Sequence, residues 1–158
     1  MTDTAAGQDT SKAAVRLVVA VKRLRSRMRE ESGATSLGLS AAQLSIFSRL
    51  MQEGAATAAS LAAAEHVSQQ AIAQCLTVLK ADGLVSVAPD PADGRKSLIS
   101  VTASGRRLYQ SIMASRDAWL IRAIESAIAP GERDALDQAI ELLERLGDVD
   151  LGPRPGLR

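Results

Sequence analysis

The chain has 158 residues, of which 46% are hydrophobic, and its formal net charge is +1. This length predicts one domain, or one domain with a dimerisation extension, and the scarcity of aromatic residues predicts a core of aliphatic side chains between helices. The single cysteine excludes an intrachain disulfide and a cysteine-based zinc cluster, and the near-neutral charge excludes a general polyanion-binding protein.

The sequence predicts a cytoplasmic protein that has no membrane partner. Residues 1–10 are polar and lack the apolar region of a signal peptide, and the charge-free runs of the chain are too short to span a bilayer. No residue pattern indicates a cofactor. His66 and Cys75 are the only histidine and cysteine, and we expect the turn between their helices to point them apart, so catalysis has little support.

The first predicted element is a long helix over residues 12–31, which follows a polar segment, residues 1–11, that we expect to be disordered. Within the helix, apolar residues alternate three and four positions apart, at Ala14, Leu17, Val21, Leu24 and Met28. Such a stripe requires a partner surface.

Charge is concentrated at the two ends of the chain. Residues 12–31 contain seven basic residues and two acidic ones, a local charge of +5, whereas residues 132–150 contain seven acidic and two basic residues, a local charge of −5. The two segments could pair across a subunit interface, or each could be a solvated helix face.

Three shorter helices are predicted next, each from a capping residue. Ser40 with Gln43 forms a capping box that opens a helix ending at Gly54. Thr57 can cap a helix that runs to about Glu65, and after a tight turn Ser68 can cap the next one. Two short helices joined by a few residues are typical of a helix-turn-helix.

The helix after Ser68 has one apolar side, formed by Ile72, Leu76 and Leu79, and we expect Gly83 to end it in the left-handed conformation. Two apolar runs, residues 84–88 and 97–101, then flank a turn at residues 89–96 and predict a β-hairpin. The segment from 40 to 102 therefore predicts a winged helix. An ordinary helical hairpin with a surface β-loop would give a similar pattern.

Two further amphipathic helices are predicted over residues 103–146, separated at Pro130, and we expect the tail at residues 147–158 to be flexible. A winged helix does not need three additional long helices for its own core. The simplest use of residues 12–31 and 103–146 is a two-fold dimerisation region, although they could also pack as a bundle within one subunit. The expected fold is mainly α with a small β-hairpin wing: a winged helix-turn-helix with long terminal dimerisation helices.

The turn and the strand after it resemble the wing signature of the MarR (multiple antibiotic resistance regulator) family, in which Asp-x-Arg precedes a strand that ends in an aliphatic residue and Thr. The matching residues are Asp93-Gly94-Arg95, Ile99, Val101 and Thr102. The resemblance extends over residues 14–146, and the segments similar to the family's helix-two opening and two-helix reader are Leu39 to Gln43 with Leu50, Leu61-Ala62 and Val67 to Ile72. The chain has Gly94 where many members carry a second arginine, and glutamine at 69 and 74 where a basic residue is common.

The polar face of the helix after Ser68 is the candidate for reading DNA. A glutamine amide can contact adenine N6 and N7 together, so we expect base contacts from Gln69, Gln70 and Gln74, and a cap and phosphate contact from Ser68. We expect Arg95 to enter the minor groove, as the resemblance also implies, and Lys96 to meet a phosphate or remain solvated. Asp93 would shape the turn and orient Arg95.

The resemblance also implies a small aromatic or phenolic effector, bound between the dimerisation helices and the winged helix. The residues expected near that junction are Phe47, Met51, Tyr109 and Met113, although each could be plain core. Arg16 and Arg23 could serve an anionic effector. Cys75 is either a buried inert thiol or, as in some members of the family, an oxidant sensor.

Together these expectations describe a sequence-specific regulator of transcription that binds double-stranded DNA. We expect a homodimeric repressor that is released by a ligand and that places two reader helices on a pseudo-palindromic operator, in major grooves roughly 34 Å apart. The alternative is a winged helix used for protein contact, which the cation-free outer face of the reader helix would also allow.

Overall fold

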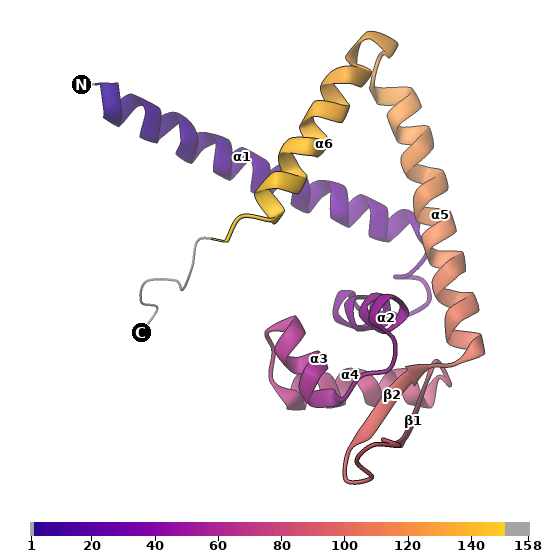
Figure 1. Cartoon of the computed structure of the whole chain (residues 1–158). Coiled ribbons are helices and arrows are strands. Elements are labelled where there is room, and N and C mark those ends of the chain that lie inside the picture. Colours follow the sequence, from indigo (N-terminus) through magenta and orange to yellow (C-terminus); the bar gives the residue numbers. More distant parts are fainter. Residues whose placement is uncertain (1, 151–158) are drawn as a thin grey trace. The chain divides into compact units, whose positions relative to one another are not determined.

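The structure, a computed structural model, describes residues 2–150 and is mainly helical, with one antiparallel hairpin (Figure 1). The elements in chain order are α1 (Thr2–Glu31), α2 (Ala41–Glu53), α3 (Ala58–Glu65), α4 (Gln69–Ala81), β1 (Val85–Pro89), β2 (Ser97–Val101), α5 (Ala103–Ala127), the 3-10 turn η1 (Pro130–Glu132) and α6 (Arg133–Gly147). The described residues fall into two compact units that divide between Trp119 and Leu120. The predicted winged helix-turn-helix is confirmed.

Side-chain caps start the three short helices at the predicted positions. The Ser40 hydroxyl accepts from the Gln43 amide nitrogen at 3.1 Å, and the Gln43 side chain accepts from the Ser40 backbone at 2.6 Å, which completes the capping box of α2. Thr57 accepts from the Ser60 backbone at 3.1 Å, and Ser68 accepts from the Ala71 backbone at 3.2 Å. Each cap satisfies a backbone N–H that has no partner within its helix.

The helix α4 ends as predicted. Gly83 has φ of +66°, and the Leu84 amide donates to the Leu79 carbonyl oxygen at 2.9 Å. Glycine adopts the left-handed backbone conformation without steric strain, and this conformation lets the chain reverse directly into β1. The strands β1 and β2 then pair antiparallel from Val85 with Val101 to Pro89 with Ser97.

The core of the winged helix lies where α2, α3, α4, the hairpin and the first half of α5 meet. Its most deeply buried side chains are Ile46, Phe47, Leu61, Ile72, Leu79 and Ile112. The hairpin is also tied to the loop between α2 and α3. Ala56 and Ile99 exchange two backbone hydrogen bonds of 3.1 and 2.8 Å, so they form an isolated antiparallel β-bridge, which the sequence analysis did not predict.

The helix α5 is joined closely to the end of α4. The Thr102 hydroxyl donates to the Gly83 carbonyl oxygen at 2.8 Å and accepts from the Gly105 amide at 3.0 Å, so it links the end of α4 to the start of α5. Gly105 itself is buried against Leu84. Here α5 approaches the hairpin so closely that a side chain at 105 would have no room.

The first helix differs from its expected bounds. α1 begins at Thr2, ten residues before the expected start at Lys12, so residues 2–11 are helical where the sequence predicts no ordered element. Extending an existing helix requires no new nucleus, and residues 2–11 contain no proline to stop it. Residue 1 of the expected disordered start, and residues 151–158 of the expected flexible tail, lie outside the described residues.

Candidate nucleic-acid interface and adjoining cleft

The turn between α3 and α4 sets the position of the recognition helix. His66 has φ of +54° and caps α3 with its backbone N–H, which lies toward the carbonyl oxygens of Ala62 and Ala63. Two residues later Ser68 starts α4. The single histidine thus serves the turn through its backbone, and its side chain is exposed, whereas Cys75 is half-buried in α4.

The predicted reading residues share one exposed face of α4. Gln69, Gln70 and Gln74 are all exposed, whereas Ile72 and Leu79 on the opposite side are buried. The same outer face carries Ala73 and Thr77, which the sequence argument passed over. Ala73 and Thr77 stand three and seven residues after Gln70, and this helical spacing was the signal that could have identified them.

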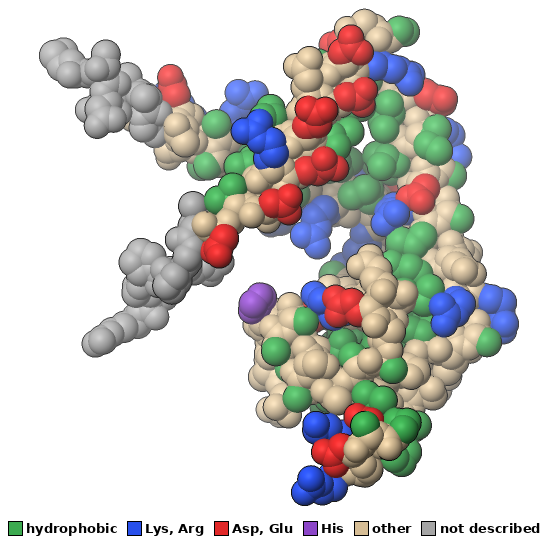
Figure 2. Space-filling model, viewed as in Figure 1, with side chains coloured by type: hydrophobic (Ala, Val, Ile, Leu, Met, Phe, Trp, Pro, Cys, Tyr) green, Lys and Arg blue, Asp and Glu red, His purple; other side chains and the backbone are tan. Residues whose placement is uncertain are grey.

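The wing tip is an ordered turn with two cations. The Asp93 carboxylate accepts from the backbone N–H and the Nε of Arg95, both at 3.2 Å, and lies 3.6 Å from Lys96 Nζ. The Lys96 amide donates to the Asp93 carbonyl oxygen at 2.8 Å, which closes the turn. The Arg95 side chain is still 93% exposed. Basic side chains are visible at the end of the hairpin in Figure 2.

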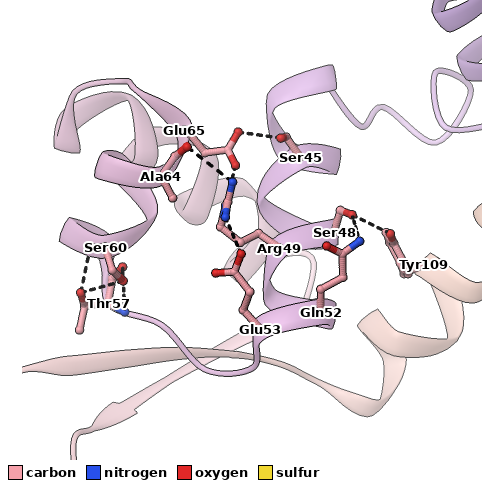
Figure 3. A network of polar contacts seen from close by, with 10 residues as sticks. All are labelled: Ser45, Ser48, Arg49, Gln52, Glu53, Thr57, Ser60, Ala64, Glu65 and Tyr109. Carbon is pink, nitrogen blue, oxygen red and sulfur yellow. Dashed lines mark hydrogen bonds and ion pairs between the residues drawn. The ribbon is translucent and has the colours of Figure 1, made fainter. Parts of the chain in front are cut away.

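A polar network joins α2 to the end of α3 (Figure 3). The Arg49 guanidinium donates to Glu65 Oε1 at 2.9 Å and to Glu53 Oε1 at 2.5 Å, and the Ser45 hydroxyl donates to Glu65 Oε2 at 2.6 Å. The bond from Ser45, and then the bond from Arg49, lower the pKa of the Glu65 carboxyl, while the bond to Glu65 raises the pKa of Arg49. The last residue of α3, directly before the helix-turn-helix turn, is therefore clamped to α2.

An open cleft of about 610 Å³ lies between α1, α2 and α5, and is called here the α1–α2–α5 cleft. Its walls combine apolar side chains, hydroxyls and cations, without an acidic residue. The cationic members are Lys22, Arg25, Arg29 and Arg116. Arg29 donates through Nη2 to the Leu39 carbonyl oxygen at 3.2 Å, while its buried Nε has no hydrogen-bond partner within the described residues.

The structure separates the four residues that were expected to line a ligand site. Tyr109 and Met113 line the α1–α2–α5 cleft. Phe47 is buried in the core and stacks on Tyr109, with ring centroids 5.8 Å apart, and Met51 packs against the core without lining this cleft. The Tyr109 hydroxyl donates to Ser48 Oγ at 2.9 Å, so one wall of the cleft is bonded to α2.

The cations that reach the cleft from α1 are not the two expected from the sequence. Arg16 and Arg23 lie outside its lining, whereas Lys22, Arg25 and Arg29 belong to it. The last three are separated by three and four residues and so share one helix face. That spacing was readable in the sequence, but only the packing of α1 reveals which face meets α2 and α5.

Within residues 8–150, no group of histidine, cysteine, aspartate or glutamate side chains is arranged to hold a metal ion. A search of the described helices also finds none that is long and apolar enough to cross a membrane.

The sequence of the chain is similar to proteins of a known family. The sequence model of the MarR family matches residues 37–96, from before α2 to the wing. An HTH-type transcriptional regulator of Mycobacterium bovis is 34% identical over 132 residues, which cover 84% of this chain and 90% of that protein, and a Mycobacterium tuberculosis regulator matches to the same extent.

Solved structures agree with the sequence comparison. A protein from Pseudomonas aeruginosa superposes with a TM-score of 0.79 at 29% identity, over 90% of this chain and 98% of its own. BpsR of Bordetella bronchiseptica, whose DNA binding is regulated by 6-hydroxynicotinic acid, gives 0.57 at 28% identity, over 83% and 92%. The reader helix, the wing and these relatives lead to one conclusion: the chain belongs to the MarR family of DNA-binding transcriptional regulators and is not an enzyme.

Proposed function

We propose that the protein is a homodimeric repressor that binds a pseudo-palindromic operator and is released when a small aromatic anion occupies the α1–α2–α5 cleft. The observation that carries this proposal is that α2 serves both sites. Ser45 lines the cleft, and its hydroxyl also donates to Glu65 at the end of α3. A ligand in the cleft would thus lie one hydrogen bond from the helix-turn-helix.

In the proposed complex, α4 lies in the major groove and the wing reaches the adjacent minor groove. Arg95 is the minor-groove contact, because its side chain is almost fully exposed while Asp93 fixes the base of the turn. Lys96 meets a phosphate. The residues proposed to face the major groove from α4 and its cap are Ser68, Gln69, Gln70 and Gln74.

The proposed dimer uses residues 12–31 and 103–146. α1 exposes Val15, Val18 and Val19 to between 55% and 66% in the single chain, and α6 exposes Leu142 and Leu146 to 54% and 59%. A two-fold contact would remove such apolar stripes from water and would present two reader helices to successive major grooves.

An aromatic anion suits the chemistry of the α1–α2–α5 cleft. The cations of α1 and the absence of acidic residues in the lining favour a negative group, while Arg116 is paired with Asp117 at 2.7 Å. The unpartnered Arg29 Nε supplies a buried donor. Tyr109 and Met113 supply apolar surface for a ring. The ligand of the relative BpsR, 6-hydroxynicotinic acid, is an acid of this kind.

Release would follow from competition for the Ser45 hydroxyl. Its single proton is donated to Glu65, and a carboxylate in the cleft could accept that proton instead. Of the two bonds that join Glu65 to α2, only the bond from Arg49 would then remain, and the end of α3 would be less firmly held. Because α4 begins four residues later, its position in the groove would change.

DNA binding is tested by titrating the full chain against the DNA that flanks its own gene, at several salt concentrations. A DNA-binding protein displaces counterions, so the logarithm of its affinity should fall linearly with the logarithm of salt concentration. A protein that uses its winged helix only for protein contact would show no specific retention and no such slope, and that outcome would reject the proposal.

Ligand release is tested with two matched variants of α1. Arg25→Ala removes a cation that lines the cleft, whereas Arg23→Ala removes an exposed cation outside it. With 6-hydroxynicotinate or another aromatic acid as the added ligand, Arg25→Ala should require about tenfold more ligand for release from DNA, and Arg23→Ala should respond as the parent does. Equal responses of the two variants would place the ligand elsewhere.

A further inference from the structure

We propose that α4 selects A·T base pairs in each half-site, with Gln70 and Gln74 meeting adenine and the methyl groups of Ala73 and Thr77 meeting thymine. This inference rests on the proposed DNA binding and deepens it by naming the base pairs and two further specificity-determining residues.

The four residues form one row on the recognition helix. They stand at positions i, i+3, i+4 and i+7 counted from Gln70, so they share a face, and all four are exposed. Ile72 and Leu79 hold the opposite side of the helix in the core with 1% exposure or less. Rotation of α4 about its axis is thereby fixed, and the row is the part of the helix that a groove would meet.

The hydroxyl of Thr77 is already used within the helix. Thr77 Oγ1 donates to the Ala73 carbonyl oxygen, one turn earlier, at 2.8 Å. The group that Thr77 can present to a base edge is therefore its methyl group. Ala73 also presents a methyl group. Thymine is the base that carries a methyl group in the major groove, and an apolar side chain next to it is favourable.

The rest of the row points to the same base pair. A glutamine amide donates and accepts at once, which matches adenine N7 and N6, whereas guanine is read mainly by arginine or lysine and cytosine by carboxylates. α4 has no acidic residue, and its only basic residue is Lys80 in the last turn. Lys80 lies three residues beyond Thr77, in the last turn of α4, where its flexible side chain can meet a DNA phosphate.

The wing favours the same composition in the other groove. A·T-rich segments have a narrow minor groove with a strong negative potential, which attracts arginine. Arg95 is the exposed arginine of the wing, and Asp93 holds its backbone in the turn. Major-groove and minor-groove contacts of one subunit would therefore both select A·T pairs.

The first test is a selection of duplexes from a random library by the full-length protein. The expected result is a two-fold site with A·T pairs at the bases under α4 in each half. A selected site with G·C pairs at those bases would overturn this inference alone and leave DNA binding intact. A protein that retains no duplex would overturn the proposed function with it.

The second test removes single chemical groups from the selected duplex. Uracil in place of thymine removes only the methyl group, and 7-deazaadenine in place of adenine removes only the N7 acceptor. Each replacement under α4 should lower affinity roughly threefold or more per half-site. If neither replacement changes affinity at any position of the half-site, the inference is wrong.

Paired variants assign the contacts to residues. Thr77→Ser keeps the hydroxyl that bonds to the Ala73 carbonyl but removes the methyl group, whereas Thr77→Val keeps a methyl group and removes the hydroxyl. At one thymine, replacement by uracil should not lower the affinity of the Thr77→Ser variant any further. The Thr77→Val variant should still bind the thymine duplex more tightly than the uracil duplex. Likewise Gln70→Ala should become insensitive to 7-deazaadenine at one position. Gln110→Ala, an exposed glutamine on α5, is the control and should keep every preference of the parent.

Discussion

At the tip of the wing, one arginine is both ordered and open to solvent. Asp93 binds the Arg95 backbone and Nε, and yet 93% of the Arg95 side chain is exposed. An exposed pair of this kind adds little to stability, because water screens it and competes for both partners. Replacing the Arg95–Asp93 ion pair by a contact with DNA would therefore cost little free energy.

Arg95→Ala should weaken binding to operator and to scrambled duplexes alike. The loss of one cationic contact should lower the slope of log affinity against log salt concentration by about one unit per subunit. The melting temperature should stay within about 2 °C of the parent, since the side chain is almost fully exposed and its one ion pair is at the surface. Affinities for both duplexes at three salt concentrations, with melting curves, measure this.

Arg16→Ala is the matched control for the wing, because it removes an equal charge from the exposed side of α1. Its salt slope should equal that of the parent. If Arg95→Ala unfolds the protein, or binds both duplexes as tightly as the parent, the assignment of the wing to DNA is incorrect.

Glu65 makes stability depend on pH in a defined direction. Its folded-state pKa is lowered from 4.5 by the hydroxyl of Ser45 and the guanidinium of Arg49. A carboxyl whose pKa is lower in the folded state stabilises the fold above its unfolded pKa, and that contribution is lost as pH falls through the folded value. The contribution of Glu65 should therefore be complete at neutral pH and be lost as pH falls below 4.5 and through the lower folded-state pKa.

Glu65→Gln keeps an oxygen that can accept from Ser45 but removes the charge. We expect it to lower the free energy of unfolding by about 1 kcal/mol at pH 7, and by less at an acidic pH well below 4.5, where the parent carboxyl begins to be protonated. Urea unfolding at the two pH values measures the difference. Glu53→Gln tests the more exposed carboxylate on the same Arg49, and its effect at pH 7 should be smaller. A constant difference between Glu65→Gln and the parent at both pH values would show that the charge is unimportant.

At the scale of elements, the junction between α4, the hairpin and α5 leaves no room for a side chain at residue 105. Gly105 lies in the first turn of α5, where a Cβ would collide with the Leu84 carbonyl oxygen and come within 2.9 Å of Phe47 Cζ. Alanine is the better helix former by about 1 kcal/mol, so an unhindered Gly→Ala change in a helix would stabilise it. Here the clash should reverse that sign.

Gly105→Ala should lower the free energy of unfolding by about 2 kcal/mol, because the backbone of α5 must move away from Leu84. It should also weaken DNA binding, since the same junction supports the hairpin. Gly131→Ala is the control: a Cβ at residue 131 would meet nothing within 4 Å. Its free energy of unfolding should lie within about 0.5 kcal/mol of the parent. Denaturant unfolding of both variants decides between a clash at 105 and a simple propensity effect.

The elements whose signals are local could be predicted from the sequence. The caps at Ser40, Thr57 and Ser68 act on residues three positions away, and Gly83 acts on its own turn. A reader of the sequence sees both partners of each such interaction. The winged helix was predictable for this reason, and so were the exposed glutamines of α4.

The features that escaped prediction join residues far apart in the chain. Ala56 pairs with Ile99, and Ser45 bonds to Glu65 at a separation of twenty residues. Tyr109 bonds to Ser48 across sixty-one. No local pattern reports such contacts, because they depend on how the helices pack. The same holds for the cleft, where packing selects Arg25 and excludes its neighbour Arg23.

At the scale of the whole molecule, apolar side chains remain exposed on the helices near both ends of the chain. Within the described residues, the exposed large apolar side chains of α1 include Val15, Val18 and Leu24, and those of α6 include Leu142 and Leu146. Exposed apolar residues that stand singly are ordinary, but a contiguous apolar stripe is typical of an interaction surface. In a symmetric dimer, the second copy of the chain would cover these exposed apolar side chains.

We therefore expect a dimer in solution at micromolar concentration, and a charge placed in the stripe should disrupt it. Leu143→Asp puts a carboxylate among exposed apolar side chains of α6, where burial in an interface would cost several kcal/mol, so dissociation should become favourable. Gln138→Asp adds the same charge to α6 at a polar position and should leave the dimer unchanged. Sedimentation equilibrium gives the mass of each variant, and far-UV circular dichroism shows whether the helices persist.

Deletion of residues 131–158 should shift the protein toward the monomer as well. A parent protein that sediments as a monomer at these concentrations would contradict the dimer, and with it a symmetric operator read by two α4 helices.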